Sequence, residues 1–277
     1  MYREVCEVLE NKKVAPGHFV LKLRSKKISK SSQPGQFVQI LCSGDSLDPL
    51  LPRPFSFLDV NGPDFSLLYH VVGQGTELMA KFKKGDPIHV LGPLGCGFTH
   101  MGLKGQRLFL VGGGVGIPPL YHLARTLVKA DPGLKKNIHV LLGARNKTLL
   151  LCENDFKKLG IQLHLSTDDG SKGKKGFVTS LLTASLKEDH KKARIFSCGP
   201  TPMLKAVSLV ASEFGVPNEA SVEVPMACGF GACLGCAIKV RVDVGAGLKP
   251  ARTASDYRYA IACTEGPVFE GSKILWD

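Results

Sequence analysis

The sequence has no apolar run that approaches the roughly 20 residues needed for a membrane-spanning helix. Its first residues, Met-Tyr-Arg-Glu-Val-Cys-Glu-Val, are charged and alternating, and they lack the apolar core of a signal peptide. Low-complexity tracts are also absent. We therefore expect a cytoplasmic protein without a membrane partner, whose nine cysteines are thiols or metal ligands rather than disulfides.

Basic stretches interleaved with aromatic residues, which are typical of nucleic-acid-binding proteins, are missing as well. The formal net charge is +12, but the lysines lie in short separate runs such as Lys26-Lys27 and Lys172 to Lys175. Such runs are mostly solvated faces that can also attract an anionic dinucleotide or an acidic partner. We expect no nucleic-acid partner.

Residues 1–100 are predicted to form a small antiparallel β-barrel. Short alternating segments are separated by turn signals such as Pro34-Gly35 and Gly85-Asp86, and six strands at this spacing favour a closed or nearly closed barrel. The expected strands are Tyr2–Leu9, His18–Ser25, Gln36–Cys42, Phe55–Val60, Ser66–Val72 and Pro87–Leu91.

Two segments of the expected barrel carry binding chemistry. In Arg53-Pro54-Phe55-Ser56, the arginine can neutralise a phosphate and the hydroxyl can reach a ring nitrogen. In Gly73-Gln74-Gly75-Thr76, a glycine turn leads into a short helical stretch whose free N–H groups can bind an anion. Each segment alone is also compatible with an ordinary loop, but together they indicate the diphosphate of a flavin.

Residues 101–217 are predicted to form an α/β domain with a parallel sheet, because strands alternate with helices there. Thr201 is the expected N-cap of the last helix and Pro202 its first residue. The expected strands are Arg107–Val111, Asn137–Leu142, Gln162–Ser166 and Ala193–Ser197, and the expected helices are Leu120–Lys129, Thr179–Leu186 and Met203–Phe214.

Ligands of parallel sheets bind beyond the carboxyl ends of the strands. This rule selects Gly112, Gly113, Gly114, Gly116, Arg145, Asp168, Cys198, Gly199 and Pro200. The glycine loop departs from the standard dinucleotide fingerprint, because Ile117 or Pro119 stands at the third glycine position. A classical NAD dehydrogenase is disfavoured, whereas another kind of nicotinamide site and a plain strand-to-helix turn both stay open.

Residues 218–277 contain the most specific motif of the chain. Cys228, Cys233 and Cys236 have the Cys-x4-Cys-x2-Cys spacing of plant-type ferredoxins, and Cys263 can complete four thiolates for a [2Fe–2S] cluster. The intervening glycines allow the backbone to wrap closely around inorganic sulfide. A structural zinc site is the alternative, but it usually takes two Cys-x2-Cys pairs, and Cys263 stands alone.

With these three modules in this order, the chain resembles the ferredoxin–NADP reductase superfamily. More narrowly, it resembles the electron-transfer subunits of NAD-dependent, heterodimer-type dihydroorotate dehydrogenases. The resemblance covers essentially the whole chain. It is carried by Arg53–Ser56, Tyr69–Val72, Gly75-Thr76, Gly92–Gly95, Val111–Gly116, Thr167–Gly170, Cys198–Pro200, Met226–Cys236 and Cys263–Phe269.

The resemblance implies a role for each matching segment. FAD would be held by Arg53, Pro54, Phe55, Ser56, His70, Val71 and Val72, with Gly75 and Thr76 at its pyrophosphate. Ser56 would lie near the reactive flavin nitrogen, and Gly112 to Gly116 with Cys198 to Pro200 would line the nicotinamide path. Cys198 at the end of a buried strand is alternatively a small hydrophobic residue. Cys228, Cys233, Cys236 and Cys263 would ligate the cluster.

The implied function is electron transfer within de novo pyrimidine biosynthesis. A separate FMN-containing catalytic subunit, in a heterotetramer with two of each chain, would oxidise dihydroorotate. Electrons would pass through [2Fe–2S] and FAD to NAD+. One alternative is the small subunit of an NADPH:ferredoxin or sulfide oxidoreductase, in which an aspartate commonly replaces one cluster cysteine. The other is a non-catalytic redox-sensing scaffold.

Two points stay open in the sequence. NAD is favoured over NADP, although Arg145 and Lys147 could bind a 2′-phosphate. The stretch between Cys236 and Cys263 is longer than expected for the family, and Gly245 to Arg252 have the composition of an insertion in a surface hairpin. Because long loops cost little to close, we expect the cluster site to tolerate it.

Overall fold

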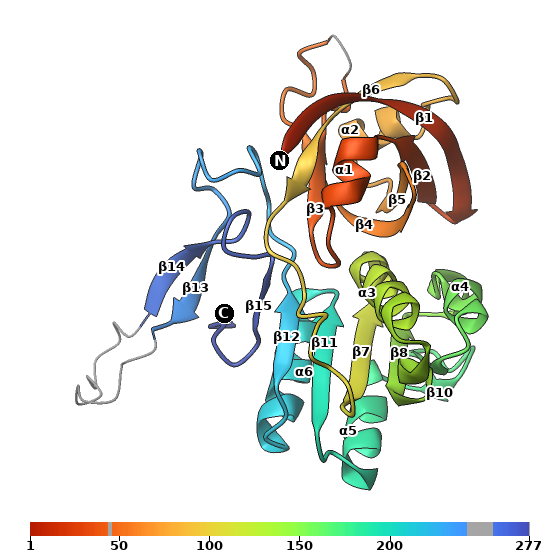
Figure 1. The fold of residues 1–277 in the computed structure, drawn as a ribbon, viewed down its shortest axis with the longest axis vertical. Helices are drawn as coiled ribbons and strands as arrows, with labels where there is room; N and C mark the ends of the chain where they lie inside the picture. Colours follow the sequence, from red (N-terminus) through yellow and green to blue (C-terminus); the bar gives the residue numbers. More distant parts are fainter. Residues whose placement is uncertain (44–45, 243–256, 277) are drawn as a thin grey trace.

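The structure is a computed structural model that describes residues 1–43, 46–242 and 257–276. Figure 1 shows a barrel at one end, an α/β unit at the other and a small hairpin beside them. This arrangement confirms the predicted fold class. The predicted insertion Gly245 to Arg252 lies outside the described residues.

The N-terminal barrel is closed, with the strand order β1-β2-β5-β4-β3-β6. Every pairing in it is antiparallel. Buried side chains alternate with exposed ones along β1, so that one face of the strand fills the barrel. The strands are β1 (Tyr2–Ala15), β2 (His18–Arg24), β3 (Phe37–Ile40), β4 (Arg53–Asn61), β5 (Asp64–His70) and β6 (Pro87–Leu94).

Two short helices accompany the barrel strands. Helix α2 (Gln74–Met79) corresponds to the helical stretch predicted from Glu77 to Lys81, but it begins three residues earlier, at Gln74. Helix α1 (Lys26–Ser31) was not predicted, because its six residues are too few for a hydrophobic period. Its signal is the N-cap Ser25, whose Oγ accepts a hydrogen bond from the Ile28 N–H at 3.2 Å.

The α/β unit is built on a seven-stranded sheet with the order β10-β9-β8-β7-β11-β12-β15. All neighbours are parallel except β12 and β15. β12 and β15 extend the sheet beyond residue 217, so the third module shares a sheet with the second. The strands are β7 (Arg107–Gly113), β8 (Ile138–Ala144), β9 (Gln162–Thr167), β10 (Lys174–Lys175), β11 (Ala193–Cys198), β12 (Asn218–Ser221) and β15 (Val268–Glu270).

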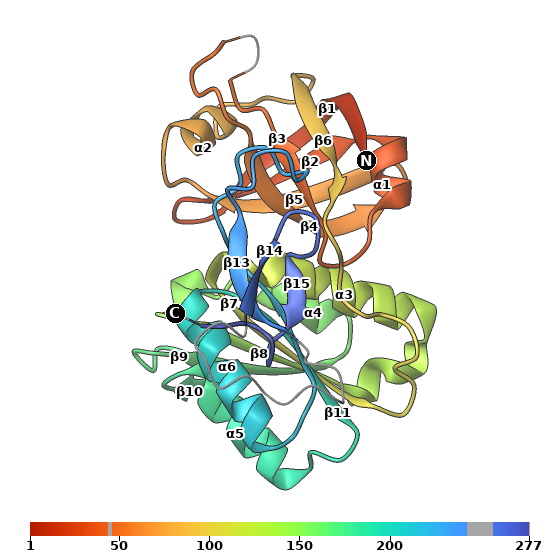
Figure 2. The same ribbon diagram turned by 90° about the vertical axis from the view of Figure 1, so that its left-hand side faces the viewer.

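Helices cover both faces of this sheet (Figures 1 and 2). α3 packs in one core with Leu110 and Val140, and α5 and α6 pack in another with Phe109 and Val111. Burial on both faces explains the continuous apolar run of β7. The helices are α3 (Ile117–Ala130), α4 (Glu153–Lys158), α5 (Val178–Glu188) and α6 (Thr201–Glu213), with 3-10 turns η1 (Gly114–Gly116), η2 (Pro132–Asn137) and η3 (Lys147–Leu149).

The predicted cap of α6 is wrong by one residue. Thr201 is already helical, and Pro200, with an extended ψ of 142°, occupies the cap position. A proline fits there because its missing N–H is not needed by the helix. In the part of the chain that is described, no helix is both long and apolar enough to cross a membrane.

The cluster module is a two-stranded hairpin, β13 (Ala237–Arg241) and β14 (Tyr257–Ile261), preceded by the cysteine loop. Figure 2 shows this loop reaching up to the barrel while the chain returns to the sheet through β15. One core joins all three parts: Phe37 and Leu94 of the barrel pack with Leu204 of α6 and with Cys236 and Cys263. The barrel and sheet also meet directly, because Arg125 of α3 forms an ion pair with Asp59 of β4.

Replacing Phe196 by alanine tests the α/β core. Phe196 in β11 is fully buried and packs edge-on against Phe98. We expect Phe196→Ala to lower the free energy of unfolding by about 3–5 kcal/mol, through lost burial and the cavity left behind. Phe177→Ala is the control, because this side chain is 72% exposed. Denaturant unfolding measures both, and equal losses would contradict the assignment of Phe196 to the core.

Candidate functional site

A cavity of about 550 Å³ lies between the barrel and the carboxyl edge of the sheet. One wall comes from the barrel and includes Arg53–Ser56 and Thr76. The other comes from the sheet and includes Val115, Cys198 and Ser221. Segments predicted separately from the sequence therefore line one space, whose volume is typical of a small-molecule site.

Arg53 is held in place on the barrel wall. Its Nη1 donates a hydrogen bond to the Leu51 carbonyl at 2.7 Å. A Cβ on Gly75 would lie 3.3 Å from Arg53 Nε, so the glycine makes room for the guanidinium. The first turn of α2 has N–H groups without intrahelical partners, and it lies beside Arg53, so this corner has the chemistry for binding an anion.

Thr76 shapes this corner from within. Its Oγ1 accepts hydrogen bonds from the Val72 and Gly73 N–H groups at 2.9 and 3.2 Å. It also donates to the Gly73 carbonyl at 2.8 Å. The hydroxyl thus fixes the turn that presents α2 to the cavity, which is a structural reason for a threonine at this position.

The segment after β5 contributes unequally to the site. His70 and Val72 line the cavity, and the His70 ring stacks on His18 with centroids 4.2 Å apart. Burial, and then the neighbouring His18, lowers the pKa of His70. Val71 does not line the cavity: its N–H donates to the Gly17 carbonyl at 2.8 Å and its side chain packs on the barrel core.

The sheet wall lies where the strand order changes direction. β7, β8 and β9 extend the sheet one way and β11 and β12 the other, so the gap between β7 and β11 is the switch point at which such sheets bind ligands. The glycine loop and the Cys198–Pro200 loop meet there. A Cβ on Gly116 would lie 2.4 Å from the Gly199 nitrogen, and one on Gly113 would lie 2.8 Å from Met203 Sδ.

Arg145 and Asp168 lie farther along the same edge and are not part of the cavity lining. The chain after β9 is tied back to the chain after β8, because the Asp168 N–H donates to the Ala144 carbonyl at 3.0 Å. Both side chains are exposed. They are placed to meet a ligand that extends outward from the cavity, beyond the ends of β8 and β9.

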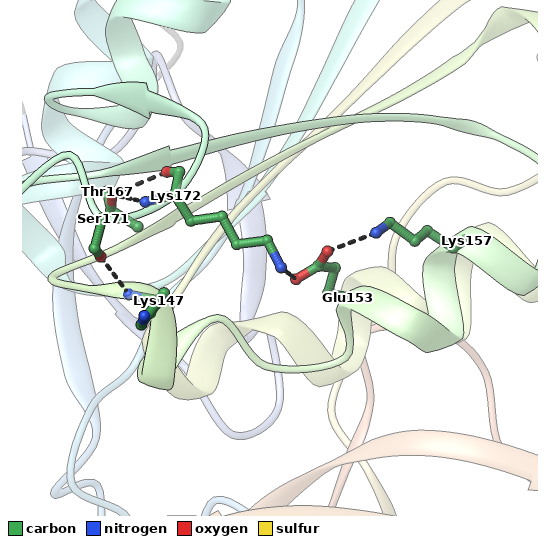
Figure 3. A network of polar contacts seen from close by, with 6 residues as sticks. All are labelled: Lys147, Glu153, Lys157, Thr167, Ser171 and Lys172. Carbon is green, nitrogen blue, oxygen red and sulfur yellow. Dashed lines mark hydrogen bonds and ion pairs between the residues drawn. The ribbon is translucent and has the colours of Figure 1, made fainter.

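A polar network fastens these two loops (Figure 3). The Lys147 N–H donates to Ser171 Oγ at 2.8 Å, and Thr167 Oγ1 donates to the Lys172 carbonyl at 2.9 Å. Glu153 pairs with Lys172 and Lys157, each at 2.7 Å. The Lys172 ammonium is therefore paired with Glu153. The contact of Lys147 with Ser171, in contrast, uses only the backbone N–H of Lys147.

Sequence reasoning missed the part of the cavity lining that lies at and just after the end of β12: Ser221, Val222, Glu223 and Val224. β12 has only four residues, too few for a hydrophobic period to predict it. The Glu223 side chain is open to the cavity, yet the surrounding protein raises the pKa of its carboxyl by burial. The only hint in the sequence that Glu223 lies near the site is its position just before the cysteine motif.

Cys198 is fully enclosed at the end of β11 and borders the cavity. Burial, and then the charge of Glu223, raises the pKa of the Cys198 thiol well above its usual value. The thiol is therefore neutral at physiological pH and is not a nucleophile. It can shape the surface that a planar ring contacts.

The four motif cysteines come together in two pairs. The Cys233 N–H donates to Cys228 Sγ at 3.5 Å, and the Cys263 N–H donates to Cys236 Sγ at 3.4 Å. The Gly231 N–H donates to Cys263 Sγ at 3.1 Å. Backbone N–H groups aimed at sulfur are the usual surroundings of iron–sulfur ligands.

This pairing fits a two-iron cluster better than a single ion. Among the described residues, no group of three or more His, Cys, Asp or Glu side chains could hold one metal ion. A structural zinc site usually takes its four ligands from two Cys-x2-Cys pairs, and this loop has one such pair, Cys233 and Cys236. A [2Fe–2S] cluster needs only two thiolates on each iron.

The thiols of the loop differ in acidity. Burial opposes ionisation of Cys228, but the N–H groups of Cys233, Phe230 and Ala232 prevail and lower its pKa to about 6. Burial, and then the hydrogen bond with Cys236, raises the pKa of Cys263 to about 12. Cys228 and Cys233 lie toward solvent, whereas Cys236 and Cys263 are buried.

Family models match two parts of the chain. Residues 110–209 match the oxidoreductase NAD-binding domain. Residues 223–275 match the iron–sulfur cluster binding domain of dihydroorotate dehydrogenase B. The first range contains the glycine loop and Cys198, and the second contains all four cluster cysteines.

Curated relatives match over almost the whole chain. Three of them are each the electron transfer subunit of dihydroorotate dehydrogenase B (NAD(+)) and are 38% identical to this chain. They come from Desulforamulus reducens, Caldanaerobacter subterraneus subsp. tengcongensis and Fusobacterium nucleatum subsp. nucleatum, and each match covers 98% of both chains.

Solved structures share the fold. The NADH-dependent reduced ferredoxin–NADP oxidoreductase structure contains a chain that is 32% identical, with a TM-score of 0.80 and coverage of 99% of this chain and 91% of that one. The ferredoxin reductase of carbazole 1,9a-dioxygenase has a TM-score of 0.67 at 22% identity, over 78% of this chain and 67% of that one. The second match supports the fold alone.

Replacing Gly116 by alanine tests the contact between the two nicotinamide-side loops. The added Cβ would lie 2.4–2.5 Å from backbone atoms of Cys198 and Gly199. Because these are backbone atoms rather than the end of a flexible side chain, one of the two loops would have to shift. Because a misplacement of about 1 Å can cost about 100-fold in rate, we expect a loss of that order in kcat/KM for NADH-dependent reduction of bound flavin. Flavin content should stay unchanged.

Gly114→Ala is the matched control for this test. Its φ is +58°, so alanine is strained there, but the added Cβ meets nothing within 4 Å. Equal effects of the two substitutions would show that strain, rather than the close approach of the loops, decides the rate.

The raised pKa of Glu223 predicts a pH-dependent stability. The folded state holds the proton to a higher pH than the unfolded state does, so the contribution of Glu223 falls as pH rises above its ordinary value near 4.5. We expect Glu223→Gln to gain thermal stability relative to the wild type as pH rises from about 4 to 7. Glu213→Gln, at the exposed end of α6, is the control; a parallel pH profile for both would refute the prediction.

Proposed function

The chain belongs to the family of electron-transfer subunits of dihydroorotate dehydrogenase B, and from this we propose that it carries electrons from a dihydroorotate-oxidising partner subunit to NAD+. The partner would be an FMN-containing catalytic subunit, and the pair would serve de novo pyrimidine biosynthesis in the cytoplasm. We further propose a heterotetramer with two copies of each chain. The three functional units would be residues 1–100, 101–217 and 218–277.

One observation carries this proposal: a single short segment connects the cavity to the cluster loop. Met226 lines the cavity, and Cys228, the first cluster cysteine, is two residues farther on. The same cavity borders Arg53–Ser56 on the barrel and Cys198 on the sheet. A flavin in this cavity would therefore lie between the nicotinamide loops and the cluster.

Each group would supply a distinct part of the chemistry. When bound, the [2Fe–2S] cluster would exchange single electrons, FAD would collect them in pairs, and NAD+ would accept a hydride. The chain would hold these groups in line. Arg53 and the first turn of α2 would neutralise the FAD pyrophosphate, and Ser56 would hydrogen-bond the edge of its ring.

The residues of the sheet wall would position NAD+. Gly112, Gly113, Gly114 and Gly116 would allow close approach of the dinucleotide, and Cys198, Gly199 and Pro200 would support the nicotinamide ring against the flavin. Arg145 and Asp168, beyond the cavity, would meet the adenosine half. No side chain has to give or take a proton in the hydride step. The site would instead align the flavin with the nicotinamide and exclude water.

We propose that the partner docks over a second hollow beside the cluster loop. This hollow, of about 590 Å³, is bordered by Met1, Leu51 and Phe230 as well as by Cys228 and Cys233. Phe230 is 48% exposed and the adjacent Leu234 is 59% exposed. An exposed apolar surface of this kind is typical of a protein interface, and it lies where an electron would enter the cluster.

A second candidate function is the corresponding role in an NADH-dependent reduced ferredoxin–NADP oxidoreductase. It is favoured by the structural match to such an enzyme over 99% of this chain. Four cysteines, rather than three and an aspartate, favour the dihydroorotate system. The fold and cofactors would be the same in both cases, so the partner decides between them.

The proposed function is tested by purifying the chain with its native partners without oxygen and assaying NAD+ reduction. We expect dihydroorotate-dependent formation of NADH and an FMN protein that copurifies with the chain. If dihydroorotate has no effect while ferredoxin or polysulfide supports turnover, the second candidate replaces the first.

Two variants separate electron transfer from docking in the same assay. Cys233→Ser should abolish dihydroorotate-dependent NADH formation, because the cluster loses a ligand, and should leave NADH-dependent flavin reduction within about twofold. Phe230→Asp should release the partner and keep the cluster spectrum, because it places a charge in the apolar hollow. A Phe230→Asp chain that still binds its partner would exclude this docking face.

A further inference from the structure

Gln39 lies in the barrel but reaches the cluster loop. It belongs to β3, where it is opposite Pro54 of β4 and Leu91 of β6, and its side chain is only 1% exposed. Gln39 Nε2 donates a hydrogen bond to the Met226 carbonyl at 3.3 Å, across 187 residues of sequence. The amide thus connects the barrel to the segment that precedes Cys228.

The same side chain supports the other side of Cys228. Gly229 has a φ of +81°, and a Cβ built on it would lie 2.6 Å from Gln39 Cγ and 2.8 Å from Gln39 Nε2. Only a glycine can lie this close to the amide. Gln39 therefore contacts the residue two positions before the first cluster cysteine and the residue directly after it.

Packing alone does not explain a glutamine at this position. Gln39 Oε1 is buried and has no hydrogen-bond partner among the described residues. The amide cannot simply be turned over, because the Met226 carbonyl needs a donor and Nε2 is the only one available in the side chain. An apolar residue of similar shape would fill the space without a buried orphaned acceptor.

The segment that Gln39 holds is the covalent link between the two redox sites of the proposed function. Met226 is buried against the flavin cavity, and Ala227 and Cys228 border the second hollow together with Gln39. A displacement of this segment would change the separation of cluster and flavin. The glycine loop and the Cys198–Pro200 loop are separate segments that pack on each other, so this displacement does not require them to move.

We propose that Gln39 is a positioning residue that fixes the Met226–Cys228 segment and thereby sets the rate of electron transfer between cluster and flavin. This inference rests on the proposed cofactors but not on the identity of the partner. In each transfer the cluster loses one electron and the flavin gains one. Two transfers and one proton from solvent supply the hydride that NAD+ accepts.

The test replaces Gln39 by methionine in the full chain carrying FAD and the cluster. Methionine has a similar length and no branch, but it cannot donate to the Met226 carbonyl. After mixing with NADH, stopped-flow absorbance follows flavin reduction and then cluster reduction. We expect the first step to stay within twofold and the second to slow by about tenfold, because small misplacements of reacting groups carry large rate costs.

Two further readouts distinguish positioning from general damage. The electron paramagnetic resonance spectrum and the midpoint potential of the reduced cluster should shift in Gln39→Met, at unchanged iron and FAD content. Gln162→Leu is the matched control, because Gln162 Nε2 also donates to a backbone carbonyl, that of Lys136 at 2.9 Å, far along the sheet. It should leave both steps and the cluster spectrum unchanged.

A wild-type spectrum together with a wild-type second step in Gln39→Met would overturn the proposal, and so would equal slowing of both steps. If this variant loses iron, Gln39→Leu decides, because leucine fills similar space and has no hydrogen-bond donor. A wild-type second step in Gln39→Leu would then refute the role. These measurements use neither dihydroorotate nor the partner subunit. Their result can therefore be interpreted even if the proposed function is wrong.

Discussion

The arrangement of the three parts depends on one shared apolar core. Phe37 and Leu94 come from the barrel, Leu204 from α6, Cys236 from the cysteine loop, and Cys263 from the segment after β14. A hairpin with so few residues cannot bury a core of its own. It is instead stabilised by contacts with both larger parts and by β15, which pairs with β12 of the central sheet. The cluster ligands are thus packed against the same residues that orient barrel and sheet.

This constraint explains why electron transfer can be built into a small chain without a flexible linker. The cavity is bordered by β4 and α2 of the barrel, by Val115 and Pro118 after β7 with Cys198 at the end of β11, and by residues 221–226. The last of these segments leads directly into the cysteine loop. Distances between the bound groups would therefore be set by packed backbone rather than by diffusion of one domain against another.

Much of this organisation could be predicted from local patterns. The six barrel strands, the parallel strands and the four cysteines all have signals within a short window of sequence, such as alternation, buried runs and fixed spacing. β11 was predicted to within one residue because its apolar run ends at a Cys-Gly-Pro turn. Arg53 and Gly75-Thr76 were selected for their chemistry, and the structure places them side by side at one cavity, which the sequence could not show.

What could not be predicted depends on contacts distant in the sequence. β12 has four residues, and only its pairing with β11 and β15 makes it a strand. Glu223 has no motif around it, and the burial that raises the pKa of its carboxyl comes from the protein that surrounds it in the fold. Val71 resembled its neighbours in sequence but points to the barrel core, because successive residues of an extended chain face opposite sides. In the sequence, Gln39 is only a polar residue among apolar ones. Its role becomes visible only in the fold, where it contacts Met226 and Gly229.

The two hollows of the molecule have no lining residue in common. One can therefore change its shape and charge by substitution while the other keeps its own, provided that Met226–Cys228 stays in place. The side that would pass electrons to NAD+ would be constrained by cofactor geometry, whereas the side that would receive a partner would be free to change. Such independence would let one reductase architecture work with different electron donors. This chain is similar both to a chain of the NADH-dependent reduced ferredoxin–NADP oxidoreductase and to electron transfer subunits of dihydroorotate dehydrogenase B.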